Sequence, residues 1–193
     1  MPKETTFDKD FVLKQATNLF REKGYNATSM QDLVEVTGLN RSSIYNTFES
    51  KKNLFLECLK SYETLYDREV LKKLVQSNTG LQAIKAIFDM YLFEMAVVKD
   101  SRGCLIVNCK SEMANHDAAI TNFLSSNQQK ALELFEDLVS QGQKDGSINQ
   151  YKSPKEYALF VYSSLQGFRM TGILVSDKLQ LQSIITTVMQ TLA

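Results

Sequence analysis

The feature that most restricts the fold is the stretch 28–53, TSMQDLVEVTGLNRSSIYNTFESKKN, because it contains two short helix signals separated by one glycine. Thr28 and Gln31 have the spacing of a capping box, which predicts a helix start at Thr28. Gly38 is suited to end that helix, since glycine enters the left-handed region without steric cost. Asn40 is a favourable cap for a second short helix. The stretch therefore predicts a helix-turn-helix.

The second of these helices has two different faces. Ile44 and Phe48 are four residues apart and are predicted to point inward. The opposite face is small or hydrogen-bonding, which suits a helix that lies in a major groove and contacts base edges and phosphates. We predict that it is a recognition helix. The predicted DNA-contacting residues are Thr28, Ser29, Asn40, Arg41, Ser42, Ser43, Tyr45, Asn46, Thr47 and Lys51.

At these residues the stretch resembles the DNA-binding domain of the tetracycline-repressor (TetR) family of transcription regulators. The resemblance rests on Gly24, Tyr25, residues 28–38, Ile44, Tyr45, Phe48, Ser50, Lys51 and Leu54. It implies that Tyr45 and Lys51 contact phosphates of double-stranded operator DNA. Asn46 and Thr47 depart from the family pattern, because members often have an aromatic residue and a histidine there. This departure concerns the base preference more than DNA binding itself.

The rest of the chain also reads as helical, and no strand-like alternation extends over a useful length. We predict an all-α fold of about nine helices, with a helix-turn-helix DNA-binding domain at 1–50 and a larger helical effector-binding and dimerisation domain at 51–193. The other expected helices cover 8–23, a long segment from Ser50 to about 76, 81–95, 104–114, a segment from Ile120 to the turn-rich residues 142–149, 153–175 and 177–192.

The last two expected helices are apolar on more than one face, so each must bury two sides. One side can pack on its own domain and the other on a second copy. In TetR-like proteins these helices form a four-helix dimer interface, and the resemblance implies a homodimer. The alternative is that both are ordinary core helices of a monomer. The predicted interface residues are Phe160, Ser164, Phe168, Ile184 and Val188.

The central helices are rich in Phe, Tyr and Met, which suits a mostly apolar effector cavity with a few polar anchors. The expected effector is a neutral or weakly polar, aromatic or amphipathic small molecule. The alternative is that the same side chains fill a solid core. The predicted pocket residues are Phe88, Tyr91, Met95, Cys104, Asn108, Phe123, Phe135, Tyr162 and Gln166.

Cys104 follows Arg102 and Gly103 at an expected helix start, where backbone N–H groups and a nearby arginine favour a thiolate. This position allows a redox- or electrophile-sensing regulator that acts through Cys104. The apolar neighbours Leu105 and Ile106 support the other interpretation, an inert buried thiol. The sequence leaves both open.

Several function classes find no support in the sequence. No phosphate-binding glycine loop or nucleophile elbow is present, and His116 is the single histidine, so we expect neither an enzyme nor a metal or cofactor site. No run of apolar residues reaches the roughly 18 to 20 needed to span a bilayer. We expect a cytoplasmic DNA-binding regulator, most simply a repressor released by an effector. A helical interaction protein without specific DNA binding is the remaining alternative.

Overall fold

The computed structural model describes residues 7–98, 100 and 102–193. These described residues form nine α-helices, which confirms the all-α prediction. The polar run at 99–103 in the sequence predicts a turn, and two of its residues, Lys99 and Ser101, lie outside the described residues. The helices are α1 (Lys9–Lys23), α2 (Met30–Thr37), α3 (Arg41–Phe48), α4 (Lys51–Val75), α5 (Gly80–Ala96), α6 (Leu105–Met113), α7 (Ala118–Asp145), α8 (Pro154–Thr171) and α9 (Lys178–Leu192).

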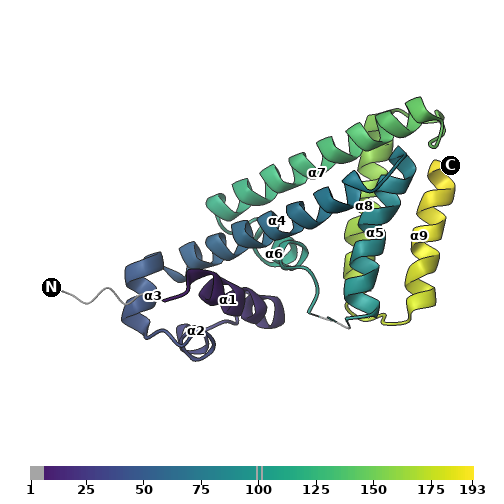
Figure 1. Ribbon diagram of the computed structural model, residues 1–193. Coiled ribbons are helices and arrows are strands. Elements are labelled where there is room, and N and C mark those ends of the chain that lie inside the picture. Colours follow the sequence, from purple (N-terminus) through teal and green to yellow (C-terminus); the bar gives the residue numbers. More distant parts are fainter. Residues whose placement is uncertain (1–6, 99, 101) are drawn as a thin grey trace.

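The helices are arranged along an elongated molecule (Figure 1). Helices α1, α2 and α3 form a compact unit at one end, and α5, α8 and α9 stand together at the other. The long helices α4 and α7 extend between the two ends. Glu63 of α4 accepts hydrogen bonds from Asn127 and Lys130 of α7, at 3.1 and 3.2 Å, and so joins these helices. We call the α1–α3 unit the head.

Side-chain caps explain where most helices begin. Ser153 and Glu156 form a reciprocal capping box with Pro154 at the first helical position, as the sequence predicts. The prediction for α2 was wrong by one residue: its cap is Ser29, paired with Asp32. The preceding hydroxyl, that of Thr28, donates instead to the Gly24 carbonyl at 2.6 Å and is buried.

The buried apolar residues form two separate clusters. The first joins α1, α2, α3 and the first half of α4 to α6 and the start of α7. The second joins α5, α8 and α9 to the second half of α7. Helix α4 contributes Leu54, Phe55 and Leu59 to the first cluster, and Val70 and Leu74 pack against the second. The head therefore shares its core with α6.

No helix in the described part of the chain is both long and apolar enough to cross a membrane.

Candidate nucleic-acid interface and ligand cavity

The turn between α2 and α3 has the geometry that the glycine predicts. Gly38 adopts φ +70° and donates its N–H to the Val34 carbonyl at 3.0 Å, which ends α2. Asn40 Oδ1 accepts the Ser43 N–H at 2.8 Å and begins α3. Because both ends are fixed within three residues, α3 leaves the turn in a defined direction.

Helix α3 buries one face and exposes the other. Ile44 and Phe48 are 0% and 1% exposed, so they anchor the helix to the head. Tyr45 is 41% exposed, and its ring centre lies 5.9 Å from the Arg41 guanidinium carbon. The predicted DNA-contacting residues that are exposed or partly exposed are Ser29, Asn40, Arg41, Ser42, Ser43, Tyr45, Asn46, Thr47 and Lys51.

One predicted DNA contact is corrected by the structure. Thr28 is 1% exposed, so its side chain supports the α1–α2 turn and cannot reach a DNA groove. Thr47 is partly buried, and its hydroxyl donates to the Ser43 carbonyl of the same helix at 2.9 Å.

Lys51, at the start of α4, is held against the head. Its ammonium donates to the Tyr25 and Thr28 carbonyls at 2.8 and 2.7 Å and lies 4.4 Å from the centre of the Tyr25 ring. Burial lowers the pKa of Lys51. In this structure the lysine therefore fixes the junction of the head and α4, a role that the sequence did not reveal.

Two further contacts connect the head with the rest of the chain. Glu112 of α6 accepts the backbone N–H groups of Tyr25 and Asn26 at 2.8 and 2.6 Å. Arg21 of α1 donates to the Gly103 carbonyl, from Nε at 2.9 Å, and forms an ion pair with Asp100 at 2.9 Å. Helix α1 and the turn after it are thus tied to α6 and to the segment that precedes α6.

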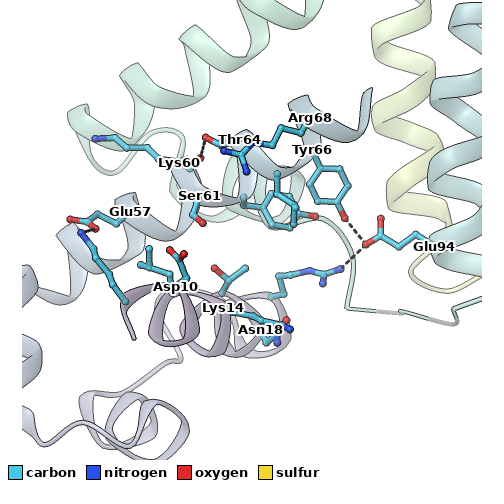
Figure 2. A pocket seen from close by; sticks show the side chains of 16 residues that line it. Asp10, Lys14, Asn18, Glu57, Lys60, Ser61, Thr64, Tyr66, Arg68 and Glu94 are labelled. Atoms are coloured by element: carbon cyan, nitrogen blue, oxygen red, sulfur yellow. Dashed lines mark hydrogen bonds and ion pairs between the residues drawn. The ribbon is translucent and has the colours of Figure 1, made fainter. Parts of the chain in front are cut away.

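Figure 2 shows a wide surface groove between α1 and α4, with a volume of about 960 Å³. The Glu94 carboxylate lies at one end of the groove, where the Tyr66 hydroxyl donates to it (Figure 2) and the Arg21 guanidinium lies 3.7 Å from it. Its walls carry side chains of both charge signs, including Asp10 and Lys14. This open, charged groove differs from the apolar pocket that the sequence predicts.

A more enclosed cavity of about 160 Å³ lies among α4, α5, α7 and α8, and we call it the four-helix cavity. Four of the predicted pocket residues line it: Tyr91, Phe135, Tyr162 and Gln166. Burial raises the pKa of Tyr91 and of Tyr162 to about 12, which keeps both phenols neutral. The sequence analysis missed Tyr62, Tyr66 and Arg169, which also line it.

A small cavity of about 20 Å³ adjoins this region. Two other predicted pocket residues, Met95 and Cys104, line it together with Tyr91, Arg21 and Arg169. Cys104 is 4% exposed, and its sulfur accepts the Val107 N–H at 3.5 Å at the start of α6. Burial raises the pKa of the other two thiols, Cys58 and Cys109, to about 12.

Three predicted pocket residues line neither cavity. Phe88 is fully buried, and its ring centre lies 5.6 Å from that of Phe168. Asn108 donates to the Arg102 carbonyl at 3.1 Å and so stabilises the segment before α6. Phe123 packs on the edge of the first apolar cluster. Helical spacing predicts that these side chains face inward, but it does not show whether an inward-facing side chain fills the core or lines a cavity.

The outer face of α8 and α9 carries exposed apolar side chains. Phe160 is 37% exposed, and Ser164 and Ile184 are partly exposed, in keeping with the predicted interface. Phe168 and Val188 are 1% and 5% exposed, so the structure places them in the core of their own subunit. Exposed residues that were not predicted are Leu159, Gly167 and Met170 of α8, Leu174 of the connection between α8 and α9, and Leu179 of α9.

Residues 12–58 match the family model of the bacterial regulatory proteins, tetR family. Residues 80–188 match the model of a tetracyclin repressor-like C-terminal domain. The second match alone covers more than half of the chain. This chain belongs to the TetR family. It is therefore a DNA-binding transcription regulator and not an enzyme, as the sequence analysis predicted.

Individual relatives agree with this assignment. The chain is 28% identical over 149 residues to the uncharacterised regulator YezE of Bacillus subtilis, covering 77% of each chain. It is 26% identical over 167 residues to the transcriptional repressor ComR of Escherichia coli, covering 86% of this chain and 80% of ComR. A solved structure of cysteine-substituted CifR with a 26-base-pair operator DNA has the same fold, with a TM-score of 0.88, 21% identity and coverage of 99% and 100%.

Proposed function

We propose that this TetR-family protein is a homodimeric repressor that binds operator DNA through α3 and is released by a small molecule in the four-helix cavity. The two-sided α3 carries the proposal, because Ile44 and Phe48 anchor it while its polar face stays exposed. The similarity to the repressor ComR and to operator-bound CifR supports it. The test is a gel shift of DNA from upstream of the gene, with affinity falling steeply as salt rises.

Two substitutions should distinguish residues that contact bases from residues that contact phosphates. Asn46→Ala is expected to change the preferred base at one position of each half-site, at a cost of about 1–3 kcal/mol. Lys51→Ala is expected to weaken binding to every sequence and to reduce the slope of log K against log salt by about one. Binding to a library of operator variants across a salt titration measures both effects.

Lys51 also fixes the head to α4, so the thermal unfolding of Lys51→Ala must be recorded in parallel. Glu133→Ala, at an exposed position of α7, is the control for a general effect of substitution. Equal affinity and equal salt slope for Lys51→Ala and the wild type would contradict the phosphate role.

The exposed apolar residues of α8 and α9 support the proposed dimerisation through these helices. Leu159, Gly167 and Leu174 lie on the outer side of these segments, and nothing lies within 4 Å of a Cβ built on Gly167. A two-fold interface on this face would bury the exposed side chains and present two heads to two half-sites.

Helix α6, like α4, connects the cavity with the head. Ile106 of α6 lines the four-helix cavity, and Glu112 at the other end of α6 caps the turn of the head at Tyr25 and Asn26. An effector that fits better when α6 is displaced would favour the conformation with displaced heads. Operator affinity then falls by the ratio of the effector's affinities for the two states.

Glu112→Ala should loosen this link. We expect faster hydrogen exchange at the Tyr25 and Asn26 amides, since both lose their acceptor, and a several-fold lower operator affinity. Hydrogen-exchange mass spectrometry and the gel shift measure the two results. Glu133→Ala serves again as the exposed control. Unchanged exchange in the α1–α2 turn would show that Glu112 does not hold it.

A second candidate function is sensing of electrophiles by Cys104. The specific observation is that Cys104 lines the small cavity together with two cationic residues, Arg21 and Arg169. The Cys104 sulfur would add to an activated carbon–carbon double bond: the C–S bond forms as the π bond breaks, the thiol gives up its proton, and the neighbouring carbon takes up a proton. Release of operator DNA by N-ethylmaleimide in the wild type, and its loss in Cys104→Ser, would support this function, whereas release retained in Cys104→Ser would exclude it.

A further inference from the structure

Arg169 of α8 lines both cavities and has no charged partner among the described residues. Its guanidinium carbon lies 4.1 Å from the centre of the Tyr91 ring and 5.8 Å from that of Tyr66. None of the ion pairs between described residues includes Arg169. Aromatic rings attract a cation but offer no strong acceptor to its five N–H donors. The site therefore holds a positive group that lacks an anion.

Gln166, three residues before Arg169, lies on the same side of α8 and also lines the four-helix cavity. Its Oε1 atom is buried and has no hydrogen-bond partner among the described residues. Buried polar atoms are nearly always paired in folded proteins, so an orphan oxygen beside a cavity indicates a missing donor. One wall of the cavity thus presents a cation that requires an anion and an acceptor that requires a donor.

Apolar side chains form much of the remaining wall, and the cavity volume limits the size of the occupant. Val70, Ile87, Ala131, Leu134 and Phe135 come from three helices and supply aliphatic and aromatic surface. The volume, about 160 Å³, is close to the roughly 150 Å³ of an apolar cavity that holds one benzene molecule. Side chains three apart on a helix are separated by about 5–6 Å, which one substituted ring can bridge.

The carboxylates that line the two cavities are exposed or are paired with cations other than Arg169. Lys130 pairs with Glu63 at 3.2 Å, and Asp67 is exposed, where solvent screens its charge. The Lys110 ammonium forms a hydrogen bond with the Tyr162 hydroxyl and places a second cation behind this wall. Glu94 and Asp100 line the small cavity together with Arg169, but both pair with Arg21, at 3.7 and 2.9 Å, so an added anionic group is favoured at Arg169.

We infer that the four-helix cavity binds a small aromatic monocarboxylate that carries a ring hydroxyl. The carboxylate accepts from the Arg169 guanidinium, the hydroxyl donates to Gln166 Oε1, and the ring fills the apolar part. This inference rests on the proposed function, because it names the chemical class of the effector. It replaces the neutral ligand expected from the sequence, since the sequence did not show that Arg169 faces the cavity.

The test compares three probes of similar shape on the purified full chain: 4-hydroxybenzoate, benzoate and the neutral 4-hydroxybenzyl alcohol. Thermal unfolding and isothermal titration calorimetry record binding, because a ligand of the folded state raises the melting temperature by mass action. We expect the largest rise for 4-hydroxybenzoate, a smaller one for benzoate and none for the alcohol. The inference is overturned if the alcohol stabilises the wild-type protein as much as the carboxylates do, or if no probe stabilises it.

Variants locate the site. Arg169→Met should raise the melting temperature of the free protein, because it removes an uncompensated charge. It should also lower the affinity for 4-hydroxybenzoate roughly tenfold or more. Arg169→Lys should retain part of the binding, and Arg68→Met, an exposed control on α4, should retain all of it. Full binding in Arg169→Met overturns the inference. Operator binding without any probe tests the proposed repressor separately, so a DNA-binding dimer that ignores every carboxylate contradicts the inference alone.

Discussion

The substitution Gly167→Glu is expected to turn the proposed dimer into monomers and to weaken operator binding by about 10²–10⁴-fold. Nothing lies within 4 Å of a Cβ at Gly167, so a single subunit accommodates the new side chain without a clash. In an α8–α9 interface the change appears twice, and two like charges would be removed from water together. One head alone then contacts one half-site, and the gain from simultaneous binding of both is lost.

Sedimentation velocity and the gel shift measure the two outcomes of this substitution. Ser126→Glu adds the same charge at an exposed position of α7 and should leave both the dimer and the operator affinity unchanged. Circular dichroism should show full helix content in Gly167→Glu, since its subunit fold is intact. If Gly167→Glu remains dimeric and binds the operator as tightly as the wild type, the interface lies elsewhere on the molecule.

The second large effect concerns stability, at the point where the start of α5 crosses α7. A Cβ on Gly80 would lie 2.3 Å from the Leu138 carbonyl oxygen and 2.4 Å from the Gly142 nitrogen. Both are backbone atoms, so relief requires the two helices to separate. We expect Gly80→Ala to cost about 3 kcal/mol of unfolding free energy and to lower the melting temperature by roughly 6–12 °C.

Gly142→Ala is the matched comparison on the other helix of this crossing. Its Cβ would lie 2.5 Å from the Cδ1 atom of Ile148, the far end of a side chain that can change rotamer. We expect a loss of about 1 kcal/mol, because the side chain moves and the backbone does not. Urea unfolding of both variants gives the difference. Equal losses at the two positions would mean that the crossing is not held as closely as these distances indicate.

Local signals in the sequence were enough to predict the helices, because caps and left-handed glycines act within a few residues. The error at α2 shows the limit of such signals. Thr28 and Ser29 are adjacent hydroxyls, and each has a capping partner three positions later, so spacing alone does not choose between them. The choice depends on the Gly24 carbonyl, which takes the Thr28 hydroxyl and leaves the cap to Ser29.

The ligand cavity was harder to predict for a related reason. Four of its residues were predicted from their aromatic or amide character, but Arg169 was missed because its neighbours in the sequence, Phe168 and Met170, give no sign of its surroundings. Those surroundings come from Tyr66 and Tyr91, which lie about a hundred and about eighty residues earlier in the chain. Contacts between such distant segments arise from packing, which a single sequence does not specify.

The shared core of the head and α6 limits how members of this family can be recombined. Leu105 and Cys109 of α6, and Ile120 of α7, belong to the same buried cluster as Val12 and Phe55. A chimera joined at residue 50 would place these side chains against foreign partners and expose apolar surface on both fragments. A hybrid regulator with a new operator and the original effector should instead exchange the head together with the matching residues of α6. The head that we propose reads the operator is thus joined through one buried core to α6, the helix that we propose transmits effector binding.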